Sequence, residues 1–323
     1  MRNHITDYHR ALVTGGAGFM GSHLVEQLLK KGLYVTVLDN LSTGSLENIH
    51  HLKKNPRLRI IISDLRDYNL IQRDIDDVDV VFHVAANPEV RVSTIKPRVH
   101  FENNLMATFN LLETMRIKDI DKLVFFSSSS VYGETEGAPV KEDNVINPVS
   151  IYGACKASCE TFIKVYSELY GIKAICLRFA NVIGPRLRHG VVYDFVLKLM
   201  KNPRRLEILG DGSQVRSYLH VYDAINATII VLEKSYKSFE VYNIGNKDWL
   251  RVNDVANIVI SAMGLGNVEL IYKPQLHGIG WPGDVKRIIM DVTRIISLGW
   301  SPKMTSKEAI YSTVKTLVKE LKI

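Results

Sequence analysis

The sequence predicts an α/β protein built on a doubly wound parallel sheet, followed by a smaller mixed α/β region. Over the first 180 residues, short runs rich in β-branched residues alternate with longer helical patterns. The strand runs are almost continuously apolar, which is typical of strands covered by helices on both faces. A glycine-rich turn joins the first strand to the first helix, as in sheets that bind a ligand at their carboxyl edge.

The elements of this first part follow one another in a regular order. The predicted strands are 11–14, 34–38, 58–62, 78–83, 122–126 and 173–177. The predicted helices are 22–31, 104–115 and 152–169. Apolar residues recur three or four positions apart in the helices, for example Leu24 and Leu28 in the first and Leu105 and Phe109 in the second. Helices of this kind between strands are the crossovers that parallel pairing requires.

After residue 181 the composition changes. Turns that contain Gly or Pro become frequent, as at Gly184-Pro185, Gly210-Asp211-Gly212 and Trp281-Pro282-Gly283. We therefore expect one domain over residues 1–180 and a second, loop-rich domain over 181–323, with some segments of the second part returning to the first.

The bulk properties exclude several classes of protein. Of the 323 residues 46% are apolar and 23% charged, a balance typical of globular proteins. The net charge is +7, but the 41 Lys and Arg residues form no dense basic block, so we expect no nucleic-acid partner. No apolar run reaches the roughly 20 residues that span a bilayer, and residues 1–10 lack an export signal. We expect a cytoplasmic protein without a membrane partner.

Three cysteines are too few for a disulfide framework. Cys155 and Cys159 share a helical face by their spacing, but neither they nor Cys176 have a neighbouring His or Cys that completes a metal set. We expect three buried thiols and no metal.

The turn after the first strand contains Gly15, Gly18 and Gly21 in the spacing GxxGxxG. Glycines there let the chain turn tightly and let a pyrophosphate approach the backbone at the positive end of a helix. A glycine triplet alone could be only a tight turn, but its place between a strand and a helix favours a dinucleotide site.

The second strand ends at Asp39, eighteen residues after Gly21. A carboxylate at this position accepts hydrogen bonds from the adenosine ribose and repels the extra phosphate of NADP. Asn40 and Leu41 follow it, not an arginine, so the predicted cofactor is NAD. Asp64, after the third strand, is either an adenine contact or a helix N-cap.

Tyr152 and Lys156 lie four residues apart in the last helix, so both side chains leave one face. A tyrosine with a pKa near ~10 is a weak base at neutral pH, and a nearby ammonium favours its phenolate form. The strand that ends at Phe126 runs into the serines 127–130, whose hydroxyls could hold an oxygen that is being oxidised. Together with the glycine turn, these residues predict an oxidoreductive site.

These segments resemble the extended short-chain dehydrogenase/reductase family, and within it the branch similar to UDP-glucose 4-epimerases. The matching segments cover nearly the whole chain: TGGAGFMGSHLV, VLDNLSTG, DLRD, VFHVAA, SSSSVYG, PVSIYGACKASCE, LRFANVIGP, GDGSQVRSYLHVYDA, GWPGDV and LGWSP. The resemblance implies a Rossmann domain and the catalytic residues Ser128, Tyr152 and Lys156. It implies NAD contacts from Gly15, Gly18, Phe19, Met20, Gly21, Asp39, Asn40, Asp64, Leu65, Ala85, Ala86, Asn104, Tyr152 and Lys156.

The resemblance also implies a nucleotide-sugar site in the second region, with Ser128, Ser129 and Tyr152 at the sugar. It implies a phosphate contact from Asn181, backbone contacts from Val191 and Val192, a pyrophosphate contact from Arg216 and a ribose contact from Asp284. A guanidinium fits phosphate oxygens, although Arg216 could instead form a salt bridge between domains. Asp284 follows Pro282-Gly283 and could equally be a turn former.

The serine cluster separates the chemistries of this family. Dehydratases and decarboxylases that it resembles carry carboxylates just before the Val-Tyr-Gly segment, where this chain has Ser129 and Ser130. Elimination would lack its acid–base pair, so inversion at C4 of a UDP-hexose through a 4-keto intermediate is expected. The alternatives are a UDP-glucuronate epimerase or decarboxylase, and a regulator that binds NAD without catalysis.

Two departures concern the sugar. Trp281 stands where many hexose epimerases have an arginine, so a phosphate contact is either missing or supplied by Arg186 or Arg188. Ile288 stands where a bulky tyrosine excludes N-acetylated sugars in some relatives, which favours a wider pocket. The family commonly dimerises through helices, and those at 104–115 and 152–169 are the candidates for a homodimer.

Overall fold

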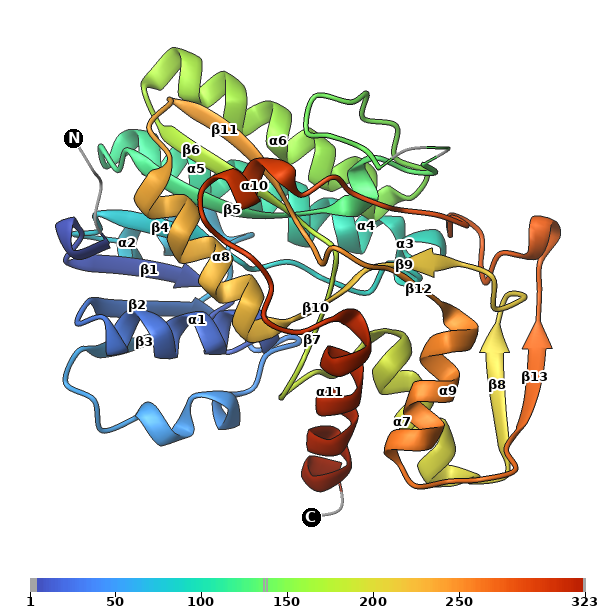
Figure 1. Ribbon diagram of the computed structural model, residues 1–323. Coiled ribbons are helices and arrows are strands. Elements are labelled where there is room, and N and C mark those ends of the chain that lie inside the picture. Colours follow the sequence, from blue (N-terminus) through green and yellow to red (C-terminus); the bar gives the residue numbers. More distant parts are fainter. Residues whose placement is uncertain (1–4, 136, 138, 322–323) are drawn as a thin grey trace.

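The computed structural model describes residues 5–135, 137 and 139–321 and contains a seven-stranded sheet in the order β11-β6-β5-β4-β1-β2-β3 (Figure 1). All neighbouring strands in it are parallel, which confirms the predicted doubly wound fold. The strands are β1 (Arg10–Thr14), β2 (Tyr34–Asp39), β3 (Leu58–Ile62), β4 (Val80–His83), β5 (Lys122–Ser128), β6 (Lys173–Phe179) and β11 (Phe239–Ile244). The strand order reverses at β1, where open α/β sheets bind ligands.

Helices cover both faces of this sheet. One face packs against α1 (Phe19–Lys30), α8 (Val221–Lys234) and α10 (Thr293–Ser297), and the other against α2 (Tyr68–Asp74), α5 (Ala107–Ile117) and α6 (Ile151–Tyr170). The two cores meet at the strands because successive side chains alternate. In β5, Val124 and Phe126 belong to the first core, whereas Leu123 and Phe125 belong to the second.

The six predicted strands are present, whereas the helix bounds and the seventh strand differ from prediction. Helix α1 begins at Phe19, three residues before the predicted start, because Gly18 already provides its N-cap. The predicted helix 104–115 begins with a π-helical segment, Phe101–Met106, after two short helices, α3 (Val92–Ile95) and α4 (Pro97–His100). β11 lies beyond residue 181 and still pairs with β6, but the domain boundary near residue 180 stays a prediction.

The second part of the chain forms a smaller group beside the carboxyl ends of the sheet strands (Figure 1). Its core joins α7 (Gly190–Lys201), α9 (Val252–Ala262), α11 (Ser306–Leu321) and β8 (Arg205–Leu209). Two-stranded pairs complete it: β8 with β13 (Glu269–Lys273), β7 (Asn181–Ile183) with β10 (Tyr218–His220), and β9 (Val215–Arg216) with β12 (Leu250–Arg251). This group faces the edge of the sheet at which the glycine turn lies.

The three cysteines are buried free thiols, as predicted. Over the part of the chain that the structure describes, no helix combines the length and apolar character needed to cross a membrane. The same described residues contain no group of three or more His, Cys, Asp or Glu side chains placed to hold a metal ion.

Candidate active site

A cavity of about 1030 Å³ lies between the sheet edge and the second group. Its walls come from the loops that follow β1 to β6, from the start of α7, and from residues around Asp284. The predicted site residues that line it are Gly15, Gly18, Phe19, Met20, Gly21, Asp39, Asn40, Asp64, Leu65, Ala85, Ala86, Ser128, Ser129, Tyr152, Lys156, Asn181, Val191, Val192, Arg216 and Asp284. The fold therefore brings residues from both halves of the chain to one chamber.

Asn104 is the one predicted site residue that is not among the lining residues, and its NAD contact stays a prediction. Its side chain is buried at 1% exposure behind the cavity wall, because it leaves the π-helical segment toward the loop after β4. There its Oδ1 accepts a hydrogen bond from the Asn87 N–H at 2.8 Å, and its Nδ2 donates to the Asn87 carbonyl at 3.3 Å. Asn104 thus holds a wall of the cavity and is not itself a lining residue.

The glycine turn meets the requirements of a pyrophosphate cradle. Gly15 has φ +68°, and a Cβ on it would lie 2.8 Å from the backbone of Ala85. A Cβ on Gly21 would lie 2.1 Å from the Gly15 carbonyl oxygen, whereas one on Gly18 would meet only that oxygen at 3.1 Å. Gly15 and Gly21 are therefore demanded by packing, and Gly18 keeps the N-terminus of α1 open to the cavity, where helix N–H groups attract an anion.

Asp39 ends β2 at the cavity. Its carboxylate accepts hydrogen bonds from the backbone N–H groups of Ala17 at 2.9 Å and Leu41 at 2.8 Å. Burial raises the pKa of Asp39, and these two hydrogen bonds oppose the rise. The carboxylate is thereby fixed beside the glycine turn, in the place where a dinucleotide ribose would be held.

Asp64 has partners that the sequence did not predict. Arg66 forms an ion pair with it at 2.7 Å, and Asn40 donates a hydrogen bond to it at 3.0 Å. Chiefly the Arg66 hydrogen bond lowers the pKa of Asp64 to about 2. The N-cap of α2 is Asp67, which accepts from the Leu70 N–H, so the alternative role of Asp64 as a helix cap is wrong.

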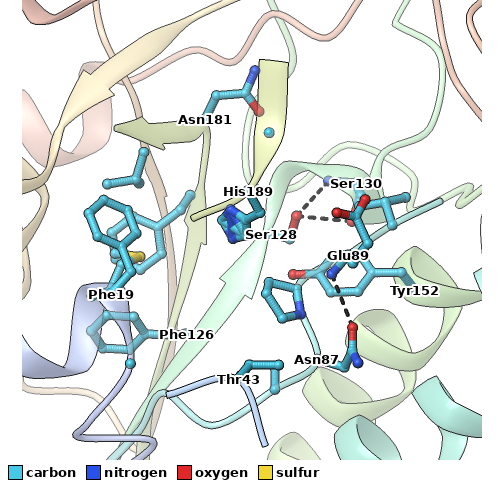
Figure 2. Close-up of a pocket in the computed structure, with 18 of the residues that line it drawn as sticks. Phe19, Thr43, Asn87, Glu89, Phe126, Ser128, Ser130, Tyr152, Asn181 and His189 are labelled. Atoms are coloured by element: carbon cyan, nitrogen blue, oxygen red, sulfur yellow. Dashed lines mark hydrogen bonds between the residues drawn. The ribbon is translucent and has the colours of Figure 1, made fainter. Parts of the chain in front are cut away.

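Ser128 and Tyr152 face each other at the end of β5 and the start of α6 (Figure 2). The Ser128 Oγ accepts two hydrogen bonds from Ser130, one from the backbone N–H at 3.2 Å and one from the hydroxyl at 2.9 Å. A hydroxyl has one proton and two acceptor sites, so the Ser128 proton is left to donate. Tyr152 lines the cavity beside Ser128.

Burial raises the pKa of Tyr152 to about 12, and the hydrogen bond with Ser128 opposes that rise. Lys156 lies on the same helix as Tyr152, but the acceptor that the structure gives its ammonium is at the end of β5. Its Nζ donates to the Phe126 carbonyl at 2.7 Å, and burial lowers its pKa to about 8. That Lys156 acidifies Tyr152 therefore stays a prediction.

Ser127 points to the opposite side of β5 and supports the site from behind. Its hydroxyl donates to Glu160 at 2.5 Å, and Glu160 forms an ion pair with Arg178 at 2.7 Å. Arg178 also donates to the Tyr132 hydroxyl at 2.7 Å. Both side chains of the ion pair are buried, at 3% and 5% exposure, so this network ties β5, β6 and α6 together beneath the serines.

Arg216 and Asp284 line the cavity but contact each other. The Arg216 guanidinium pairs with the Asp284 carboxylate at 3.0 Å and donates to the carbonyls of Val215, Val285 and Lys286. The structure thus contains a salt bridge at Arg216, but within residues 181–323 and not between the two predicted domains, and the predicted phosphate contact would require Arg216 to exchange a partner. The reason is that β9 and residues 284–286 run alongside each other.

Arg186 and Arg188 line the same cavity and also have carboxylate partners. Arg186 pairs with Glu26 at 2.5 Å and Arg188 with Glu320 at 3.0 Å. Trp281 and Ile288 are lining residues as well. The positions that depart from the pattern of relatives therefore do face the chamber.

Among the lining residues that were not predicted are Glu89, Arg91 and His189. Glu89 adds a carboxylate to the chamber at a place away from the Val-Tyr-Gly segment, where Ser129 and Ser130 stand as the sequence shows. Glu89 enters the chamber from the loop after β4 (Figure 2). A polar residue shortly after a buried strand at the ligand-binding edge was the signal that could have indicated it.

Comparison with known proteins agrees with this geometry. The model of the NAD dependent epimerase/dehydratase family matches residues 11–245. The chain belongs to this family. This confirms the resemblance to the extended short-chain dehydrogenases/reductases, and the cofactor is NAD. The cradle of Gly15, Gly18 and Gly21 and the carboxylate of Asp39 fit that cofactor.

Individual relatives narrow the group within the NAD dependent epimerase/dehydratase family. A putative UDP-glucose 4-epimerase of Methanocaldococcus jannaschii is 40% identical, covering 94% of this chain and 96% of its own. A crystal structure of a UDP-galactose 4-epimerase has a TM-score of 0.87 at 45% identity, covering 97% and 99%. A Bacillus cereus UDP-glucuronic acid 4-epimerase with NAD and a fluorinated UDP-glucuronic acid has a TM-score of 0.87 at 32% identity, covering 97% and 99%. Within the family, this chain belongs to the group of UDP-sugar 4-epimerases, which are isomerases.

Proposed function

We propose that the protein inverts C4 of a UDP-hexose, interconverting UDP-glucose and UDP-galactose through a 4-keto intermediate. The observation that carries this proposal is that Ser128 and Tyr152 line one cavity together with the glycine cradle. A proton acceptor and a dinucleotide site in one chamber are what oxidation and re-reduction of one carbon require.

Tyr152 is the proposed proton acceptor for the 4-hydroxyl, and Ser128 donates a hydrogen bond to the same oxygen. NAD, when bound, supplies the hydride acceptor and a positive ring that favours the phenolate. Within the chain, Ser128 opposes the rise in the pKa of Tyr152. Lys156 keeps the end of β5 in place through the Phe126 carbonyl, so its proposed role is to position the serine and the cofactor.

The second region is proposed to hold the nucleotide while the sugar turns over. Asn181 and the first turn of α7, with Val191 and Val192, line the cavity opposite the sheet edge. Arg216 would exchange Asp284 for the diphosphate, since a guanidinium binds phosphate oxygens in the same forked geometry as a carboxylate. Residues 1–180 would then bind mainly NAD and residues 181–323 mainly the UDP-sugar.

Two alternatives have less support. Elimination or decarboxylation needs a carboxylate beside the serine cluster, where Ser129 and Ser130 stand. A regulator that binds NAD without catalysis has no need of Ser128, Tyr152 and Lys156 in one chamber. The width near Ile288 favours acceptance of N-acetylated sugars in addition, because an aliphatic side chain lines the wall there.

The test is to incubate the purified protein, without added NAD, with UDP-glucose, UDP-N-acetylglucosamine and UDP-glucuronate, and to follow the products by proton NMR. We expect UDP-glucose to reach an equilibrium with UDP-galactose and no carbon to be lost. Retained NAD is released by denaturation and quantified after enzymatic reduction to NADH, which fluoresces. Loss of CO₂ from UDP-glucuronate, or NAD without any epimer, would support one of the two alternatives instead.

A homodimer is also proposed, through α5 and α6. Apolar and aromatic side chains are exposed along both helices, among them Phe109 at 40%, Phe162 at 39% and Leu169 at 67%. The rings of Phe109 and Phe162 meet edge to face at 5.7 Å, so the two helices present one continuous surface for a second copy. Light scattering after gel filtration should give twice the chain mass for the native protein and a monomer for Phe162→Glu; a native monomer would contradict the proposal.

A further inference from the structure

The loop after β4 brings a charged pair into the cavity. The Asn87 side chain accepts a hydrogen bond from the Glu89 N–H at 3.1 Å, and Asn104 holds Asn87 from behind. Arg91 Nε donates to Glu89 Oε1 at 3.2 Å. The Glu89 backbone is therefore anchored to the π-helical segment, a kind of segment that is frequent at functional sites.

Glu89 lies at the sugar end of the cavity. It shares the lining with Ser128 and Tyr152, and Figure 2 shows its side chain turned into the chamber on their side. The His100 ring packs edge to face on Tyr152 with centroids 5.6 Å apart. Burial lowers the pKa values of His100 and His189, and Glu89 acts against both shifts.

A sugar that places its C4 at Tyr152 would share the chamber with this carboxylate. An ionised carboxylate only accepts hydrogen bonds, so it matches a donor such as a sugar hydroxyl or an acetamido N–H. A uronate group offers no donor and has the same charge. Arg91 offsets part of this repulsion, but the pair is 34% and 42% exposed and therefore weak, so the Glu89 carboxylate can exchange Arg91 for a donor on the sugar.

We propose that Glu89 is a specificity-determining residue that binds a hydroxyl or amide N–H of the sugar and excludes UDP-uronates. The proposal rests on the proposed function, because it assumes that Tyr152 marks the position of C4. It narrows the substrate class to UDP-sugars that are uncharged at the hexose. It also assigns a role to a residue that lies outside the motifs of the serine cluster and the Tyr152 helix.

Calorimetric binding in a Tyr152→Phe background tests the proposal without turnover. UDP, UDP-glucose and UDP-glucuronate are titrated into that variant and into the same variant with Glu89→Gln. The amide keeps the size of the side chain but removes its charge. We expect Glu89→Gln to raise the affinity for UDP-glucuronate, relative to the affinity for UDP-glucose, by about tenfold or more. The affinity for UDP should not change.

The matched control is Glu102→Gln in the same background. Glu102 pairs with Arg98 on the π-helical segment and is not among the residues that line the cavity. Each of three outcomes would overturn the proposal. The ratio of the UDP-glucuronate and UDP-glucose affinities could stay unchanged in Glu89→Gln, or change equally in Glu102→Gln. The protein could also prefer UDP-glucuronate before the substitution at Glu89. The ratio of the two affinities is a binding measurement and does not depend on turnover. The proposed function is tested separately by the NMR assay, in which absence of epimerisation by the native protein would count against it.

Discussion

Ser130 donates two hydrogen bonds to the Oγ of Ser128, at 3.2 Å from its backbone N–H and at 2.9 Å from its hydroxyl. This relationship decides which way the Ser128 proton can point, because both acceptor positions of that oxygen are already engaged. The serine is thus oriented as a donor before any substrate arrives. Its partner within the protein is Tyr152.

The first prediction concerns that orientation. Ser130→Ala removes the hydroxyl donor but keeps the backbone N–H, so Ser128 becomes freer to rotate. We expect kcat to fall roughly tenfold with KM nearly unchanged, whereas Ser128→Ala should lower kcat by about 10² or more, since it removes the donor itself. Steady-state epimerisation of UDP-glucose measures both. A Ser130→Ala enzyme with native kcat would show that the second hydrogen bond has no part in catalysis.

The second prediction concerns the buried ion pair beneath the serines. Arg178→Met leaves the Glu160 carboxylate buried without its partner and should lower the free energy of unfolding by about 3–5 kcal/mol. Replacing both residues by apolar ones, Arg178→Met with Glu160→Leu, should cost less than the single change because no charge is then stranded. Urea unfolding followed by circular dichroism gives both values. A double variant less stable than the single one would contradict this reasoning.

The third prediction concerns acid stability. Burial lowers the pKa of His83 to about 3, and its ring nitrogens contact the hydroxyls of Thr14 at 2.7 Å and Thr108 at 2.9 Å. Between about pH 6.5 and pH 3 the unfolded chain holds a proton on His83 that the folded chain does not hold. The contribution of His83 to the free energy of unfolding is therefore fully present above pH 6.5 and is lost as the pH falls toward 3. The slope should be about 1.4 kcal/mol per pH unit.

The measurement is the free energy of unfolding in urea at pH 4.5, 5.0 and 5.5 for the native protein and for His83→Asn. The asparagine can still bond the two hydroxyls but does not titrate. We expect the variant to have a lower free energy of unfolding than the native protein at neutral pH. Its free energy of unfolding should also change less with pH, by about 1.4 kcal/mol per pH unit, which corresponds to one proton. Equal slopes for the two proteins would mean that His83 is protonated in the folded state.

Much of the fold could be predicted from the sequence because local patterns carry it. The six predicted strands are present, and so is the helix that contains Tyr152, because each is a separate apolar run bounded by turn residues. β11 was not predicted, because its place at the edge of the sheet depends on the chain returning across the domain boundary. The π-helical segment has the same side-chain spacing signal as an ordinary helix and could not be distinguished from one.

The sequence could predict which residues line the candidate site, but not which of their side chains contact each other. Spacing placed Tyr152 and Lys156 on one face, yet it could not show that the ammonium would be taken by the Phe126 carbonyl. Nor could a motif show that Arg216 and Asp284, 68 residues apart, bind each other. Glu89 was missed for the same reason, since a contact between two loops is set by tertiary structure.

The most direct test of the account is Tyr152→Phe, which keeps the ring and removes only the proposed proton acceptor. The purified variant and the native protein are given UDP-glucose, and the rate of epimer formation by NMR is compared with the NAD that each protein retains. We expect the variant to retain NAD and to lose at least about 10³ in kcat, because no neighbouring group replaces the phenol. Epimerisation at the native rate by a variant that retains NAD would contradict the account.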